Sequence, residues 1–191
     1  MDINKAIRKQ NKSYKRFMLS MCFIFFILPF ALLIANKFDV FFLTYLAIIE
    51  LLILTTIVIT INAGYLKYDY DNYKIKIKQG LFKIEFNLVC NKVVLVHTEG
   101  EGTQFNIILL TTSRFRNKKI KLIDQEFLKN NSYVAHHYYK LKKQHPEEEY
   151  YYFIITKGGF IKYKLLDTIY KSCVSAVYTE EAIEKIKEFR S

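Results

Sequence analysis

The chain has 191 residues, of which 51% are apolar, and a formal net charge of +11. This length suits one ordinary domain, and the basic balance favours anionic partners. The three cysteines, Cys22, Cys90 and Cys173, lie far apart and include no CxxC pair, which argues against a disulfide framework. They are typical of isolated small hydrophobic residues in a reducing compartment. No nucleic-acid-binding motif accompanies the positive charge, so no nucleic-acid partner is expected.

Two long apolar runs follow a basic segment of residues 1–16. The first run, residues 17–36, has 20 residues without a charge, and a helix of that length spans roughly 30 Å, the thickness of a bilayer core. The second run, residues 40–66, has 27 residues and one charge, Glu50. Because only the short stretch of residues 36–39 connects the runs, they predict an antiparallel transmembrane hairpin over residues 17–66. Residues 67–191 then form a separate cytoplasmic domain.

The distribution of cations predicts the orientation of this hairpin in the cell membrane. The six basic residues before the first run are Lys5, Arg8, Lys9, Lys12, Lys15 and Arg16. The connection between the runs contains only Lys37, and further lysines follow the second run. Both termini are therefore expected in the cytoplasm. Tyr14, Tyr65 and Tyr68 fit an aromatic belt at the same interface.

The basic segment places Ile3, Ala6, Ile7 and Tyr14 at helical spacing, with the cations between them. This spacing predicts a short amphipathic helix lying on the inner leaflet. Near anionic inner-leaflet lipid, each cation contributes about 1 kcal/mol to binding. The alternative is a basic tail that serves only the topology.

Glu50 lies 11 residues past Asp39 and therefore near the middle of the membrane. A carboxylate there is costly, so it is expected to be protonated, paired or facing a polar cavity. Antiparallel pairing brings Glu50 level with Phe25, whose carbonyl lacks an amide donor because Pro29 has no N–H. A protonated Glu50 could donate to that carbonyl. The alternative is that Glu50 faces a partner helix or a second copy of the chain.

The remaining sequence changes to the period of β-strands. Tyr73, Ile75 and Ile77 alternate with lysines, which predicts a strand with one buried face. Gly80 ends that strand, and further strands are predicted at residues 82–88, 92–97, 105–112, 118–123 and 150–156. Gly158-Gly159 predicts a hairpin turn into a strand over residues 160–166. Residues 169–178 are ambiguous and are interpreted as a last strand.

Two helices complete the domain. Residues 132–143 have a helical pattern that ends before Pro146. Thr179 is typical of an N-cap before a closing helix with an apolar stripe, formed by Ala182, Ile183, Ile186 and Phe189. The predicted fold class is thus a membrane α-helical hairpin with an α+β cytoplasmic domain, mostly antiparallel and closed by a C-terminal helix.

The stretches Lys78-Gln79-Gly80-Leu81-Phe82 and Asn91-Lys92-Val93, placed after two membrane helices, resemble bacterial pleckstrin-homology-like (PH-like) membrane proteins of the YdbS and YdbT kind. The resemblance covers residues 17–112 and the last helix, and residues 125–146 depart from it. It implies a PH-like fold and a non-enzymatic membrane-anchored module. Some members are linked to protection against membrane-active bacteriocins. The resemblance implies no site residues.

Catalytic signals are weak. His136 and His137 are adjacent and point apart on a helix, so a metal site with His145 and the acidic residues 147–149 is less expected than a solvated surface. The Gly100 and Gly102 stretch has no Walker lysine, and no residue lies in a nucleophile motif. We therefore expect no enzyme, cofactor or metal.

The expected function is that of a membrane-anchored binding or scaffold module, with bacteriocin self-protection or envelope stress as candidate roles. Its expected partners are the bilayer, anionic inner-leaflet lipid, and either a protein or a second copy of the chain. The alternative is an accessory subunit of a transport or secretion complex, in which Glu50 contacts another subunit's helix.

Overall fold

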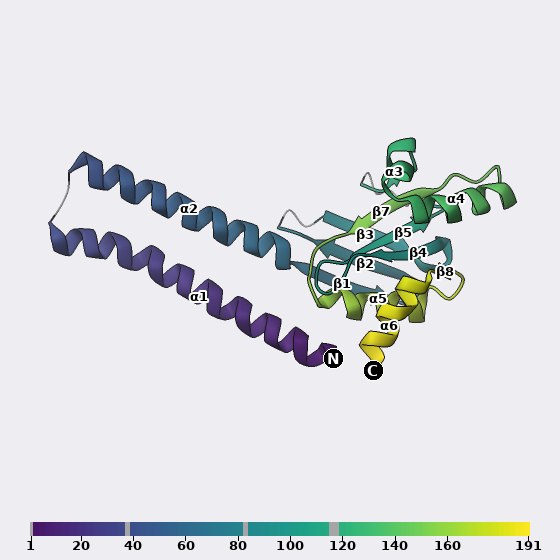
Figure 1. Ribbon diagram of the computed structural model, residues 1–191, viewed down its shortest axis with the longest axis horizontal. Coiled ribbons are helices and arrows are strands. Elements are labelled where there is room, and N and C mark those ends of the chain that lie inside the picture. The colour runs from purple at the N-terminus through teal and green to yellow at the C-terminus, as the bar shows by residue number, and fades with distance from the viewer. Residues whose placement is uncertain (1, 37–38, 82–83, 115–118) are drawn as a thin grey trace.

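The computed structural model describes residues 2–36, 39–81, 84–114 and 119–191, and consists of two long apolar helices followed by a mostly antiparallel sheet domain with C-terminal helices (Figure 1). The elements are α1 (Ile3–Ala35), α2 (Val40–Gly64), β1 (Leu66–Asp71), β2 (Lys74–Gln79), β3 (Ile84–Val89), η1 (Cys90–Lys92), β4 (Val93–Glu99), β5 (Asn106–Thr111), β6 (Lys121–Leu122), α3 (Gln125–Asn130), α4 (Ser132–Gln144), β7 (Tyr151–Ile155), α5 (Ile161–Ser172), β8 (Val177–Tyr178) and α6 (Glu180–Arg190).

Both N-terminal helices are long and apolar enough to cross a membrane, by length and composition. Helix α1 begins at Asp2, whose side chain accepts a hydrogen bond from the Lys5 amide at 3.1 Å, and it ends at Asn36 in the left-handed conformation. The basic segment is therefore the first part of one continuous helix and not a separate element. Its start lies beside α6, so the two termini of the chain are close together (Figure 1).

Strands β1, β2 and β3 form an antiparallel sheet in that order, with Ile77 opposite Phe86 across the β2–β3 pair. Ile75 and Ile77 are fully buried and alternate with less buried lysines, which confirms the predicted alternation. Strand β1 was not predicted, because residues 65 and 66 were assigned to the second apolar run. The helix in fact ends at Gly64, and Tyr68 belongs to β1.

The second sheet has the order β6-β7-β5-β4-β8 among the described residues, and is antiparallel except for the β4–β8 pair. One face packs on the first sheet, where the rings of Phe86 and Phe153 stack at 4.9 Å between centroids. Helices α5 and α6 contribute to this core. The other face packs on α3 and α4 through a cluster that includes Leu110, Phe127 and Val134.

The region after β7 differs from the prediction. Gly158-Gly159 does not make a hairpin turn, and the predicted strand over residues 160–166 is the first half of helix α5. Alternation of apolar residues with lysine holds for only a few residues here, whereas Leu165, Leu166 and Ile169 form one buried helical face. The burial of this helical face on the core therefore favours a helix over the predicted strand.

Several other boundaries also differ. The last predicted strand, residues 169–178, is reduced to β8, which pairs in parallel with β4. The strand predicted at residues 118–123 is seen only as β6, and residue 118 lies outside the described part. Helix α3 was not predicted. Helix α4 and the closing helix α6 are confirmed, and the Thr179 side chain caps α6 by accepting from the Ala182 amide.

Candidate functional site

Helix α2 enters the sheet domain without a linker, because only Tyr65 separates its last residue from β1. The side chain of Asn62 fixes this joint. Its Oδ1 accepts hydrogen bonds from the Leu81 amide at 2.9 Å and from Lys157 Nζ at 2.6 Å. The Ala63 carbonyl accepts a further bond from the Gly158 amide at 3.0 Å. The end of α2 is therefore held by two separate loops of the domain.

Helix α1 is fixed to the same domain by its first turns. Ile3 is 2% exposed within the domain core, and Ile7 packs against that core. Gln10 binds the loop after β7 with both ends of its amide. Its Oε1 accepts from the Phe160 amide at 2.9 Å, and its Nε2 donates to the Gly158 carbonyl at 3.4 Å. Of the apolar stripe predicted to lie on a leaflet, Ile3 and Ile7 are thus packed against protein.

Two glycines make this close approach possible. A Cβ atom on Gly158 would lie 2.4 Å from Leu66 Cβ, and one on Gly159 would lie 2.5 Å from Gln10 Oε1. Both residues also have positive φ angles, 106° and 54°. Only glycine adopts this backbone without strain while leaving room for both neighbours. The Gly-Gly pair is therefore a docking platform for the two helices, in place of the predicted hairpin turn.

Between the two helices and the domain lies a cleft of about 1190 Å³, which we call the junction cleft. One wall is a single face of α1 that includes Ala6, Lys9, Gln10, Ser13, Tyr14 and Phe17. The opposite wall is formed by residues 59–61, 63 and 64 at the end of α2 and by Tyr65. Loop residues 103–104, 156 and 159–160 complete it. The Tyr14 ring lies beside Gly64, 3.9 Å from the position that a Cβ there would take, which is an ordinary van der Waals distance.

The lining of the junction cleft combines aromatic and aliphatic side chains with hydroxyl and amide groups. Among the lining residues that the structure describes, Lys9 is the one with a charge, and none carries a carboxylate. Lys9 is exposed and forms no ion pair with a described residue. An amphiphilic or anionic ligand matches this lining better than a cationic one.

Directly behind the cleft, Lys162 is fully buried. Its Nζ donates to the Thr156 carbonyl at 3.1 Å and to the Phe105 carbonyl, so it joins the two loops that bound the cleft. Burial lowers the pKa of Lys162 to about 8. Lys162 lies at a position of α5 that points into the core, where the sequence predicts a strand.

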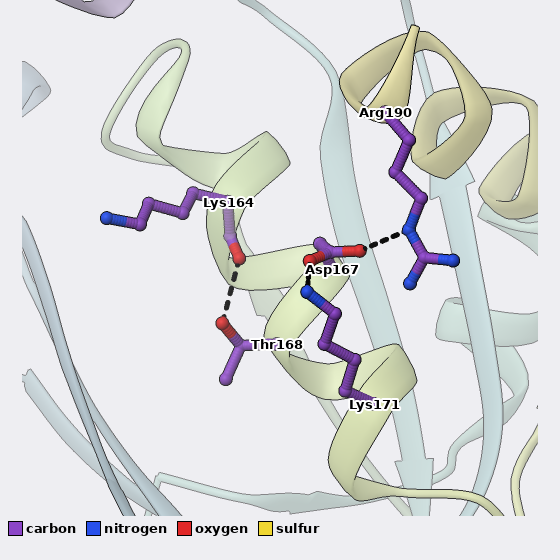
Figure 2. A network of polar contacts seen from close by, with 5 residues as sticks. All are labelled: Lys164, Asp167, Thr168, Lys171 and Arg190. Carbon is purple, nitrogen blue, oxygen red and sulfur yellow. Dashed lines mark hydrogen bonds and ion pairs between the residues drawn. The ribbon is translucent and has the colours of Figure 1, made fainter. Parts of the chain in front are cut away.

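A second polar network connects α5 to α6 (Figure 2). The buried Asp167 carboxylate accepts from Lys171 Nζ at 2.6 Å and from Arg190 Nε at 2.7 Å. Burial raises the pKa of Asp167, but the hydrogen bonds from Lys171 and Arg190 outweigh it and hold the pKa below its ordinary value. Thr168 donates to the Lys164 carbonyl on the preceding turn of α5. This network holds the last helix on the domain.

A third cluster surrounds His97, which is buried on β4. Its Nδ1 lies 3.0 Å from Thr179 Oγ1 and 3.7 Å from Glu181 Oε2, and its ring stacks on Tyr133. Burial lowers the pKa of His97, although Glu181 acts in the opposite direction. Both contacts use the same ring nitrogen, so the histidine does not bridge a hydroxyl and a carboxylate as in a catalytic triad.

Cys90 and Cys173 are free thiols that lie near each other in the same hydrophobic core. The prediction of three isolated cysteines is therefore wrong for this pair. Burial raises the pKa of both thiols, which disfavours the reactive thiolate. Across the described residues, no group of three or more His, Cys, Asp or Glu side chains is placed to hold a metal ion.

The residues predicted as sites lie in different environments. All six cations of the basic segment are exposed on α1. Tyr14 and Tyr65 line the junction cleft, whereas Tyr68 is half-buried on β1.

Pro29 is inside α1, and Glu50 is on the half-buried face of α2, with no hydrogen bond to another described residue. The predicted bond from Glu50 to the Phe25 carbonyl stays a prediction.

Sequence reasoning missed Gln10, Asn62 and Lys162. Asn62 was visible as a polar residue near the end of an apolar run, but its partners lie in loops that only folding brings near. No protein-family model, curated protein or solved structure matched this chain.

Proposed function

We propose that this protein is a non-enzymatic, membrane-anchored binding module. In this proposal α1 and α2 span the cytoplasmic membrane from residue 17 onward, both termini are cytoplasmic, and the sheet domain lies against the inner leaflet. The six exposed cations at the start of α1 support this orientation, because cations near helix ends remain in the cytoplasm. The uncovered apolar faces of both helices support insertion.

The rigid joint between the hairpin and the domain is the observation that carries the proposal. A domain on a flexible linker samples many orientations, whereas this one is held by Gln10 on one helix and by Asn62 on the other. Ordering of this kind lowers the entropic cost of binding, because the domain is oriented before its partner arrives. The mechanism is therefore docking at a fixed height and angle above the leaflet.

We further infer that the domain is a divergent PH-like fold. Two packed antiparallel sheets and a closing C-terminal helix support this inference. The parallel β4–β8 pair and helices α3 to α5 are additions to that plan.

Topology is tested first. Reporter fusions at Ser191 and in the connection at Lys37 are expected to show the C-terminus in the cytoplasm and the connection outside. An active external reporter at Ser191 contradicts the proposal.

Partner binding is tested by purification in mild detergent after crosslinking in cells. A binding module is expected to be isolated mainly as a lone species that captures a partner only when crosslinked. Reproducible co-purification of other membrane proteins without crosslinking would instead establish an accessory subunit of a larger complex.

A further inference from the structure

We propose that the junction cleft holds one anionic phospholipid, with its headgroup at Lys9 and its acyl chains between α1 and α2. This inference rests on the proposed membrane insertion of the two helices. It adds to that function a defined lipid site within the protein, distinct from general attraction between surface cations and the leaflet.

The position of the cleft matches the boundary between membrane and water. Phe17 and Ile59 lie in the apolar parts of α1 and α2, whereas Ala6 lies in the basic part of α1. From Phe17 to Ala6 the cleft follows α1 for roughly 16 Å. It therefore crosses from the apolar spans into the polar interfacial region, as a phospholipid does.

The chemistry of the lining changes along the same direction. Phe17 and Ile59 offer an apolar wall, whereas Ser13, Gln104 and Thr156 add hydroxyl and amide groups nearer the domain. Lys9 supplies a cation at the polar end, and no lining carboxylate opposes an anion. Lysine binds phosphate as a point charge, and hydroxyl groups donate to its remaining oxygens.

The cleft is large and preformed. Its volume, about 1190 Å³, exceeds the roughly 300–1,000 Å³ of pockets that hold small molecules. Its walls are held in place by the hydrogen bonds of Gln10 and Asn62 and, from behind, by Lys162. A preformed cleft retains its ligand during extraction better than a transient surface contact does.

The test uses the full-length protein in vesicles of phosphatidylcholine and phosphatidylglycerol, mixed four to one. After gentle detergent extraction, native mass spectrometry counts the lipids that remain on each chain. We expect one retained lipid, enriched in phosphatidylglycerol relative to the vesicle. Carbonate washing of the vesicles independently reports membrane insertion.

Two pairs of matched variants locate the site. Lys9→Gln is expected to lower the phosphatidylglycerol enrichment about fivefold, the effect of one interfacial cation, whereas Lys12→Gln on an exposed face of the same helix is not. Ala63→Trp places a ring in the cleft and should abolish retention of lipid, whether phosphatidylglycerol or phosphatidylcholine. Ala47 is also exposed on α2 but lies outside the cleft, so Ala47→Trp should retain the lipid as the wild type does.

Each result decides for or against the site. Equal losses in Lys9→Gln and Lys12→Gln would show general surface electrostatics and overturn the inference, as would lipid retention in Ala63→Trp. An inserted wild type that retains no lipid, or a co-purified protein in place of lipid, overturns the cleft inference alone. Release of the wild type by carbonate overturns both this inference and the proposed function.

Discussion

The two halves of α1 belong to one uninterrupted helix but meet different surroundings. In the first half, Ile3 is 2% exposed, and Gln10 binds a loop that is 150 residues away in sequence. In the second half, Ile34 is 73% exposed, and the most apolar part is not buried by the rest of the protein. The first half is thus part of the domain's packing, and the second is suited to lipid. A continuous helix can therefore pack against protein along one part and expose apolar side chains along another, without a break in its backbone.

The comparison also shows how an amphipathic pattern is satisfied. The apolar stripe at the start of α1 was expected to lie on a leaflet, but the domain core covers Ile3 and Ile7 of this stripe. Tyr14 instead lines the junction cleft. Hydrophobic burial is non-directional. The pattern therefore predicts that the apolar stripe is covered, but it does not determine whether lipid or protein covers it. Here the domain covers the start of the stripe, and the six cations of the basic segment remain exposed.

The docking platform for the first half should be the most sensitive position. We expect Gly158→Ala to destabilise the protein by about 3 kcal/mol, because its Cβ meets Leu66 and its φ is positive. The matched control is Gly102→Ala, where φ is also positive but the space is open, with a cost of about 1 kcal/mol. Thermal unfolding in detergent measures both. Equal losses in the two variants would contradict a tight joint.

The buried charge behind the platform predicts a pH dependence. Because the pKa of Lys162 is about 8 in the folded protein and 10.5 in the unfolded chain, its charge lowers stability below pH 8. This cost decreases as the pH rises from about 8 to 10.5, because the folded protein releases the proton of Lys162 before the unfolded chain does. Relative to Lys162→Met, the wild type should gain about 2 kcal/mol between pH 7.5 and 9.5.

The control for this prediction is Lys164→Met, an exposed position on the same helix. Its thermal stability should follow the wild-type pH profile. If Lys162→Met also follows that profile, the lysine titrates normally and its burial has no electrostatic consequence.

A matched pair of substitutions tests the two halves of α1 directly. We expect Ile3→Ala to cost about 2 kcal/mol, because it opens a cavity in the domain core. Ile34→Ala should stay within about 0.5 kcal/mol, because that side chain is exposed in the protein. Tryptic cleavage after Arg8 provides a second measurement, since release of the first turns exposes this bond. Similar cleavage rates in both variants would mean that the first half is not docked.

The smallest expected effect concerns Glu50, on the half-buried face of α2. Glu50→Gln preserves a donor and should keep wild-type stability. Glu50→Leu should cost about 1 kcal/mol if Glu50 bonds to the Phe25 carbonyl within the hairpin. Thermal unfolding in bilayer discs measures both. Normal folding of both variants, with loss of a co-purifying partner, would place Glu50 at an interface instead.

Sequence reasoning was accurate where structure depends on neighbouring residues. The alternating lysines of β2, the Thr179 cap of α6 and the two apolar helices all follow from patterns within one segment. It was wrong at α5, where alternation over residues 160–164 imitated a strand. Lys162 could not be recognised as buried, because both of its acceptors are carbonyls in other loops.

By itself the sequence determined the presence of two long apolar helices, the asymmetry of charge around them and the sheet-rich character of the domain, because hydropathy, charge and strand period are local properties. Only the tertiary structure decided what covers the first half of α1, that Cys90 meets Cys173, and that a cleft exists at the joint. These features depend on contacts between distant segments. The free energy of such contacts comes from packing and desolvation of surfaces that no single segment contains.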